Sequence, residues 1–139
     1  MNISRLLLAI LAGFIFLFGS DFLVHAIWLK PDYMASMQLW RPDPEMASRF
    51  SWLIAGHLLC VITFVLIWAI GFAPGGNLTL AVIYGVLMGL FSQVNTIIAY
   101  VVSPMPGTLM TKWFVVGVVQ AALLAIVTFM VYKPARPSV

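Results

Sequence analysis

The sequence predicts an all-α membrane protein built as a bundle of four transmembrane helices. Of its 139 residues, 63% are hydrophobic and 8% are charged, whereas soluble domains are about 45–50% apolar and about 25% charged. Four apolar stretches each reach the roughly 20 residues that a helix needs to cross a hydrocarbon core about 30 Å thick. Because lipid offers backbone groups no hydrogen-bond partner, each stretch is predicted to be helical. The stretches are residues 6–29, 52–73, 78–102 and 113–132.

The first stretch follows Arg5 and ends near Leu29, so its beginning is similar to a secretory signal peptide. Its apolar run is longer than the core of about 7–15 residues that such a peptide contains. We therefore predict a first transmembrane helix that is retained, and we treat residues 1–139 as a single domain.

Residues 30–51 form the one long loop of the predicted topology. Apolar side chains recur every three positions from Met34 to Trp40, which predicts a short amphipathic helix in the headgroup layer. A proline at position 44 favours a helix start there, and we predict that this helix continues into the second span. Glu45 and Arg49 are then one turn apart and are expected to pair.

Two short turns rich in proline or glycine join the remaining spans, at residues 74–77 and 103–108. With four spans, the first and third loops lie on one membrane face and both termini lie on the other. The second and fourth spans also share a spacing of tryptophan and glycine, which suggests two repeated helical hairpins related by an axis along the membrane normal. The matching residues are Trp52 with Gly56 and Trp113 with Gly117.

Polar side chains from all four spans fall at a similar depth. At a rise of about 1.5 Å per residue, they lie within roughly 11 Å of the midpoints of their spans, displaced toward the face of the first and third loops. An ionisable group exposed to lipid at this depth is costly, so Asp21 is expected to face the bundle interior with His25 or His57 as its partner. The candidate site residues are Asp21, His25, His57, Gln93, Asn95 and Gln120.

Four interpretations of this polar layer are open. It binds or transports a small ligand or a proton, with Asp21 as the titrating group. Alternatively, it lets an accessory or assembly subunit recognise a larger membrane complex, or its groups only bond to one another and fix helix register. In the fourth interpretation, His25 and His57 hold haem or, together with Asp21, a divalent metal. No further histidine or nearby carboxylate completes that set, so no cofactor is expected.

Several other functions find no support in the sequence. The net charge of +3 is scattered and forms no basic run, which argues against a nucleic-acid partner. Cys60 is the one cysteine, so neither an intramolecular disulfide nor a redox pair is available. The sequence contains no nucleophile elbow, phosphate-binding glycine loop or HExxH pattern, which favours a protein that is not an enzyme.

Small residues recur every four positions on the third and fourth spans. Gly85 and Gly89 mark one such face, and Gly117 and Ala121 mark the other. Faces of this kind let helices approach closely in lipid. They predict packing of these two spans on each other, or on a second copy of the chain or another membrane protein.

In its length, its Asp–His first span and its WLKPDY, LWRPDPEM and WFVVGVVQ segments, the chain resembles small four-helix bacterial membrane proteins that form families of unknown function. The resemblance implies a multi-pass protein of the bacterial inner membrane with no established activity. Lysine and arginine divide almost evenly between the two faces, and we expect cytoplasmic termini, with dual insertion as an alternative. Arg5, Lys133 and Arg136 lie on the face of the termini, and Lys30, Arg41, Arg49 and Lys112 lie on the other.

Overall fold

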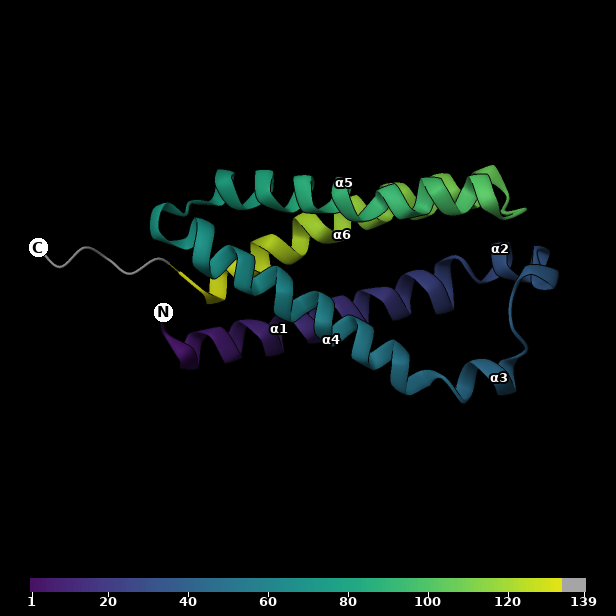
Figure 1. Ribbon diagram of the computed structural model, residues 1–139, viewed down its shortest axis with the longest axis horizontal. Helices are drawn as coiled ribbons and strands as arrows, with labels where there is room; N and C mark the ends of the chain where they lie inside the picture. The colour runs from purple at the N-terminus through teal and green to yellow at the C-terminus, as the bar shows by residue number, and fades with distance from the viewer. Residues whose placement is uncertain (134–139) are drawn as a thin grey trace, which may run out of the picture.

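The computed structural model describes residues 1–133, and Arg136 lies outside them. Within that range four helices are long and apolar enough to cross a membrane, and no strand occurs. This confirms the predicted all-α, four-helix architecture (Figure 1). The spans comprise α1 (Ile3–Asp21) continued by the π-helix η1 (Phe22–Trp28), α4 (Phe50–Ile67) continued by the π-helix η3 (Trp68–Phe72), α5 (Leu78–Val102) and α6 (Gly107–Val131).

Helices α5 and α6 lie together at the end of the bundle that carries the third loop, and α6 diverges from α5 toward its own C-terminal end (Figure 1). Their approach depends on glycine, because a Cβ atom on Gly85 would stand 2.6 Å from the Cα of Ala122, and one on Gly89 would stand 2.8 Å from the Cα of Val118. The small-residue faces therefore pack the third and fourth spans on each other, which was the first of the alternatives that the sequence predicted. Because α6 covers the Gly85 and Gly89 face, that face is closed to a partner.

Helix α1 packs against α4 and α6 near the chain ends. Gly13 allows this contact, since a Cβ atom there would lie 2.9 Å from Val61 Cγ1. The backbone nitrogen of Asn2 donates to the hydroxyl of Tyr132 at 3.3 Å, which joins the start of α1 to the end of α6. The apolar core fills this end of the bundle and includes Ala9, Val61, Val65, Trp68, Ala81, Leu124 and Ala125.

The opposite end of the bundle carries the first and third loops. There the chain forms α2 (Lys30–Ala35), the 3₁₀-helix η2 (Met37–Leu39) and α3 (Asp43–Ala47), which agrees with the helix expected in the first loop. A second buried cluster joins Leu29 to Met105 and Leu109. The first and third loops thus share one face, as predicted.

One expected helix boundary was wrong. The second span does not continue from position 44, because the helix is interrupted at residues 48–49 between α3 and α4; the expected pair nevertheless forms, with Arg49 Nη1 3.1 Å from Glu45 Oε1. The apolar stretch at residues 113–132 belongs to a helix that begins earlier, at Gly107, within the expected turn at residues 103–108. Lys112 lies in this helix, with its Nζ 2.7 Å from Oδ1 of Asp32 of α2.

The expected hairpin repeat stays a prediction. The residues that carried it differ in their surroundings: Trp52 is 78% exposed, whereas Trp113 donates a hydrogen bond to Tyr33. Gly56 has open space beside it, whereas a Cβ atom on Gly117 would collide with the side chain of Gln93. The matching positions therefore have different packing roles in the two hairpins.

Candidate functional site

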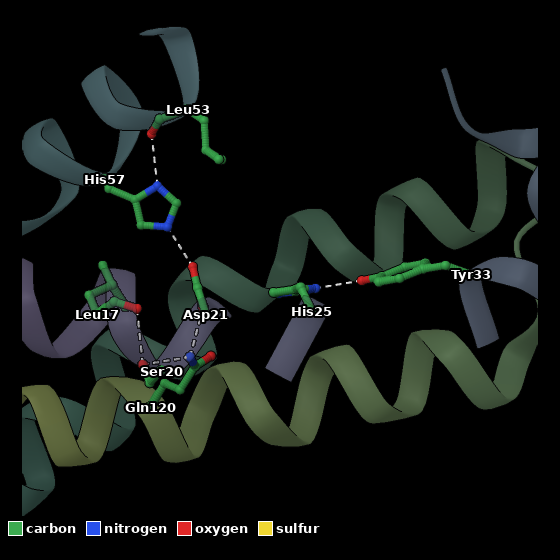
Figure 2. A network of polar contacts seen from close by, with 8 residues as sticks. All are labelled: Leu17, Ser20, Asp21, His25, Tyr33, Leu53, His57 and Gln120. Carbon is green, nitrogen blue, oxygen red and sulfur yellow. Dashed lines mark hydrogen bonds and ion pairs between the residues drawn. The ribbon is translucent and has the colours of Figure 1, made fainter. Parts of the chain in front are cut away.

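The polar centre of the molecule lies where α1 changes into the π-helix η1. Asp21 is the last residue of α1, and its side chain points between α4 and α6 (Figure 2). Short π-helical turns are rare and occur frequently at functional sites. The wider turn after Asp21 sets the direction of every polar side chain that follows it.

Asp21 and His57 connect α1 to α4. Oδ2 of Asp21 lies 2.6 Å from Nε2 of His57, and Nδ1 of the same ring lies 2.8 Å from the backbone carbonyl oxygen of Leu53 (Figure 2). The Asp21 side chain is 25% exposed and that of His57 is 12% exposed. The contact predicted between Asp21 and a histidine is therefore confirmed, with His57 as the partner.

The second carboxylate oxygen of Asp21 connects α1 to α6. The amide nitrogen of Gln120 donates to Asp21 Oδ1 at 2.7 Å and to the Ser20 hydroxyl oxygen at 3.0 Å. The Ser20 hydroxyl in turn donates to the carbonyl oxygen of Leu17 at 3.0 Å. Each oxygen of the Asp21 carboxyl group thus has its own partner, from a different helix.

The geometry determines how many protons the Asp21–His57 contact holds. A carbonyl oxygen only accepts, so Nδ1 of His57 must carry a hydrogen for Leu53. The 2.6 Å contact between Nε2 and Oδ2 then requires one proton between them, on either the ring or the carboxyl group. With that proton the pair is neutral overall, and without it two acceptors face each other and the pair carries one negative charge.

His25 belongs to a separate chain of hydrogen bonds. The indole nitrogen of Trp113 donates to the Tyr33 hydroxyl oxygen at 2.9 Å, and this hydroxyl group contacts Nδ1 of His25 (Figure 2). Since the indole only donates, the Tyr33 proton is free to bond to Nδ1, which leaves the His25 proton on Nε2. Burial, opposed by the hydrogen bond from Trp113, raises the pKa of Tyr33 to about 12, so Tyr33 stays a donor at neutral pH.

A cavity of about 540 Å³ lies between α1, α4, α5 and α6, and we call it the central cavity. Asp21 and His57 form part of its wall, together with apolar and aromatic side chains and a few amide and hydroxyl groups. The polar contributors from α5 and α6 are Ser92, Gln93, Thr96 and Gln120.

A second cavity, of about 1070 Å³, lies between η1, α2, α3 and α4, and we call it the interfacial cavity. Its wall is rich in methionine and aromatic side chains, and Lys30, Arg41 and Asp43 border it. The two cavities meet at the polar centre. The residues that border both are Asp21, His25, Leu53, His57 and Trp113.

The structure brings most of the predicted site residues together, with two exceptions. Gln93 borders the central cavity, but its side-chain oxygen accepts a hydrogen bond from Thr96 on its own helix, at 2.6 Å. Asn95 is exposed on the outer face of α5 and borders neither cavity. Sequence reasoning missed Tyr33 and Trp113 as neighbours of His25, since a tyrosine in an interfacial loop carries no signal that it contacts a histidine of the first span.

The described residues offer a poor set of donors for a metal or haem. Residues 1–133 contain no group of three or more histidine, cysteine, aspartate or glutamate side chains that could hold a metal ion. Both ring nitrogens of His57 are already in hydrogen bonds, and Nδ1 of His25 contacts Tyr33. Comparisons with protein-family models, curated proteins and solved structures gave no match to the chain.

Proposed function

We propose that the protein is a small multi-pass membrane protein that binds or transports a small ligand or a proton at its polar intramembrane site. The observation that supports this most directly is the single proton required between Asp21 Oδ2 and His57 Nε2, 2.6 Å apart in the wall of a cavity. A ligand in the cavity can therefore contact the pair that holds this proton.

The access of the pair favours binding over a purely structural role. An aspartate at the centre of a membrane helix costs about 2.5–3.5 kcal/mol on insertion scales, and amide side chains would tie two helices without that cost. A purely structural contact between helices also needs no access from a cavity. The Asp21 side chain nevertheless keeps 25% of its surface exposed and borders both cavities.

The central cavity has the size and composition of a ligand site. Its volume of about 540 Å³ falls within the roughly 300–1,000 Å³ of small-molecule pockets, which combine apolar walls with a few polar groups that fix orientation. Here the convergent polar groups are the Asp21–His57 pair and Gln120. A molecule of moderate size fits against them.

The substitution Asp21→Asn tests the proposal. Asparagine keeps the size of the side chain but cannot ionise. We expect wild-type protein in liposomes to pass protons under an imposed potential, or to gain thermal stability from at least one member of a panel of small cationic, neutral and anionic amphipaths. Asp21→Asn should lose the response.

The control is Asp43→Asn, which makes the same chemical change in an exposed loop residue outside the central cavity and should behave like the wild type. If wild type and Asp21→Asn respond alike in every assay, the contact has only a structural or assembly role.

We also propose the bacterial inner membrane, with cytoplasmic termini, as the location of the protein. The start of α1 and the end of α6 meet at one end of the bundle through Asn2 and Tyr132, so the two termini lie on the same side of the membrane. The support is the sequence resemblance and the basic residues Arg5 and Lys133 beside the termini.

A further inference from the structure

The central cavity contains a single formally charged side chain. Of the four acidic residues in the chain, Asp32, Asp43 and Glu45 lie in the first loop, and Asp21 alone lies in a span. Among the described residues, no lysine or arginine borders this cavity. Its electrostatic character is therefore decided by Asp21 and by the proton that Asp21 shares with His57.

Loss of that proton leaves a negative charge in a cavity whose wall holds no lysine or arginine. Lys112 Nζ lies 2.7 and 2.8 Å from the two carboxylate oxygens of Asp32, Arg41 lies 2.6 Å from Glu45, and Lys30 borders only the interfacial cavity. An unpaired charge in a low-dielectric site is strongly disfavoured. Something positive must take the place of the proton when it leaves.

We propose that the ligand of the central cavity is a monovalent lipophilic organic cation that exchanges with the shared proton. One proton leaves the Asp21–His57 pair for water as one cation binds, so the charge of the site stays at zero. This inference rests on the proposed function of the same site and specifies its ligand class.

The walls of the cavity suit an organic cation better than a bare metal ion. Trp52, Phe64 and Trp113 border it, and aromatic faces attract cations. The protein already contains such a contact, with Lys112 Nζ 5.6 Å from the centre of the Trp28 ring. A volume of about 540 Å³ exceeds the needs of a metal ion, and residues 1–133 supply no metal-ligand cluster.

The opening of the cavity indicates why the cation is lipophilic. The α4 residues Trp52, Gly56 and Cys60 border the cavity and are exposed. They belong to a span, so we infer that the cavity is reached from the membrane. A ligand that uses it partitions into the membrane first.

The other titratable groups near the pair border one or both cavities. Cys60 on α4 and His25 on η1 border the central cavity, whereas Lys30, Tyr33, Arg41 and Asp43 of the first loop border the interfacial cavity beside Asp21. Helices α5 and α6 contribute no titratable side chain to the wall of the central cavity. His25 contacts the Tyr33 hydroxyl group and lies outside the direct contact of the pair, so the proton that a cation displaces is the one between Asp21 and His57.

Two ions of the same shape and opposite charge test the inference. We would measure binding of tetraphenylphosphonium and tetraphenylborate to the purified full-length chain by equilibrium dialysis, with empty micelles as the blank. The expected result is binding of the phosphonium alone, with an affinity that rises by up to about tenfold per pH unit while the pair is protonated. In weakly buffered solution one proton should appear per cation bound.

Two variants locate the effect. Asp21→Asn should weaken phosphonium binding at least tenfold and abolish proton release, and Asp43→Asn should leave both unchanged. If Asp21→Asn does not fold, proton release by the wild type still decides the matter. Equal binding of both ions, or cation binding without proton release, would overturn the inference.

The outcomes separate this inference from the proposed function. If tetraphenylborate or the neutral triphenylphosphine oxide binds and Asp21→Asn abolishes that binding, the site is a ligand site but not a cation site. If neither the two charged probes nor the neutral probe binds, and liposomes show no proton flux, both proposals fail.

Discussion

At the scale of single residues, the two oxygens of Asp21 decide which substitution removes the charge while keeping the contacts. In Asp21→Asn the remaining oxygen can accept from Gln120, and the new amide can donate to His57 Nε2, because Nδ1 of that ring already carries the hydrogen for Leu53. Interhelical hydrogen bonds in membranes average about 0.6 kcal/mol. We therefore expect the free energy of unfolding of Asp21→Asn to change by about 1 kcal/mol or less.

Asp21→Leu provides the contrast in the same experiment. Leucine leaves Nε2 of His57 without its partner, at about 1–3 kcal/mol for a buried group, and leaves the Gln120 amide with Ser20 alone of its two partners. Denaturation in mixed micelles should rank the proteins wild type, Asp21→Asn and then Asp21→Leu. A leucine variant as stable as the asparagine variant would show that the network contributes nothing to stability.

The sequence identified the right residues but not all of their partners. Depth alone placed Asp21, His57 and Gln120 in one layer, and the structure joins them. The spacing of Asp21 and His25 puts them on one face of an α-helix, but residues 22–28 are π-helical. The wider π turn rotates His25 away from Asp21 toward Tyr33, and apolar periodicity carries no signal of that change.

At the scale of elements, the contact of α5 with α6 depends on the absence of side chains at two glycines. A Cβ atom on Gly85 meets backbone atoms of α6 at 2.6 and 2.7 Å, and backbone cannot move aside as a flexible side chain does. Overpacking of this kind costs about 1–3 kcal/mol. We expect Gly85→Ala to lower the melting temperature in detergent, because α5 must move away from α6.

Gly19→Ala is the matched control, since Gly19 is also helical and has nothing within 4 Å of an added Cβ atom. It should be neutral or slightly stabilising, because alanine has a higher helix propensity than glycine. Equal effects of the two substitutions would contradict the close packing of α5 on α6.

Helix positions were largely predictable from the sequence, and helix ends were less so. Residues 78–102 are helical as expected, because Asn77 and the proline-rich turn delimit them. The apolar stretch of the last span begins after Lys112, but the helix includes Lys112, which is paired with Asp32 of α2. Partners from distant segments are invisible to a local pattern.

At the scale of the whole molecule, the bundle is closed at the end of the termini and open at the end of the loops. The apolar core fills the first end, and both cavities adjoin the polar centre toward the second. The cavities were not predictable, because apolar side chains that face lipid and apolar side chains that face a cavity have the same composition.

The orientation of the bundle yields a whole-molecule prediction. With cytoplasmic termini, a green fluorescent protein fused after Val139 should fluoresce in a bacterial host, and an alkaline phosphatase fused there should be inactive. Activity of the phosphatase fusion alone would reverse the orientation. Comparable signals from both fusions would indicate dual insertion, which the near balance of lysine and arginine permits.

The central claim is that Asp21 and His57 share one exchangeable proton, and nitrogen NMR of the histidine rings tests it most directly. The chain contains two histidines, so ¹⁵N-histidine labelling with His25→Gln for assignment resolves each ring. We expect the proton of His25 on Nε2, and we expect Nδ1 of His57 to be protonated whether the shared proton lies on the ring or on the Asp21 carboxyl group.

The His57 Nδ1 signal should be that of a protonated nitrogen, whereas the Nε2 signal should depend on Asp21. In Asp21→Asn the Nε2 signal should become that of an unprotonated nitrogen that accepts a hydrogen bond from the amide. An unprotonated Nδ1 in His57, or an Nε2 signal that is identical in the two proteins at every pH, would contradict the account.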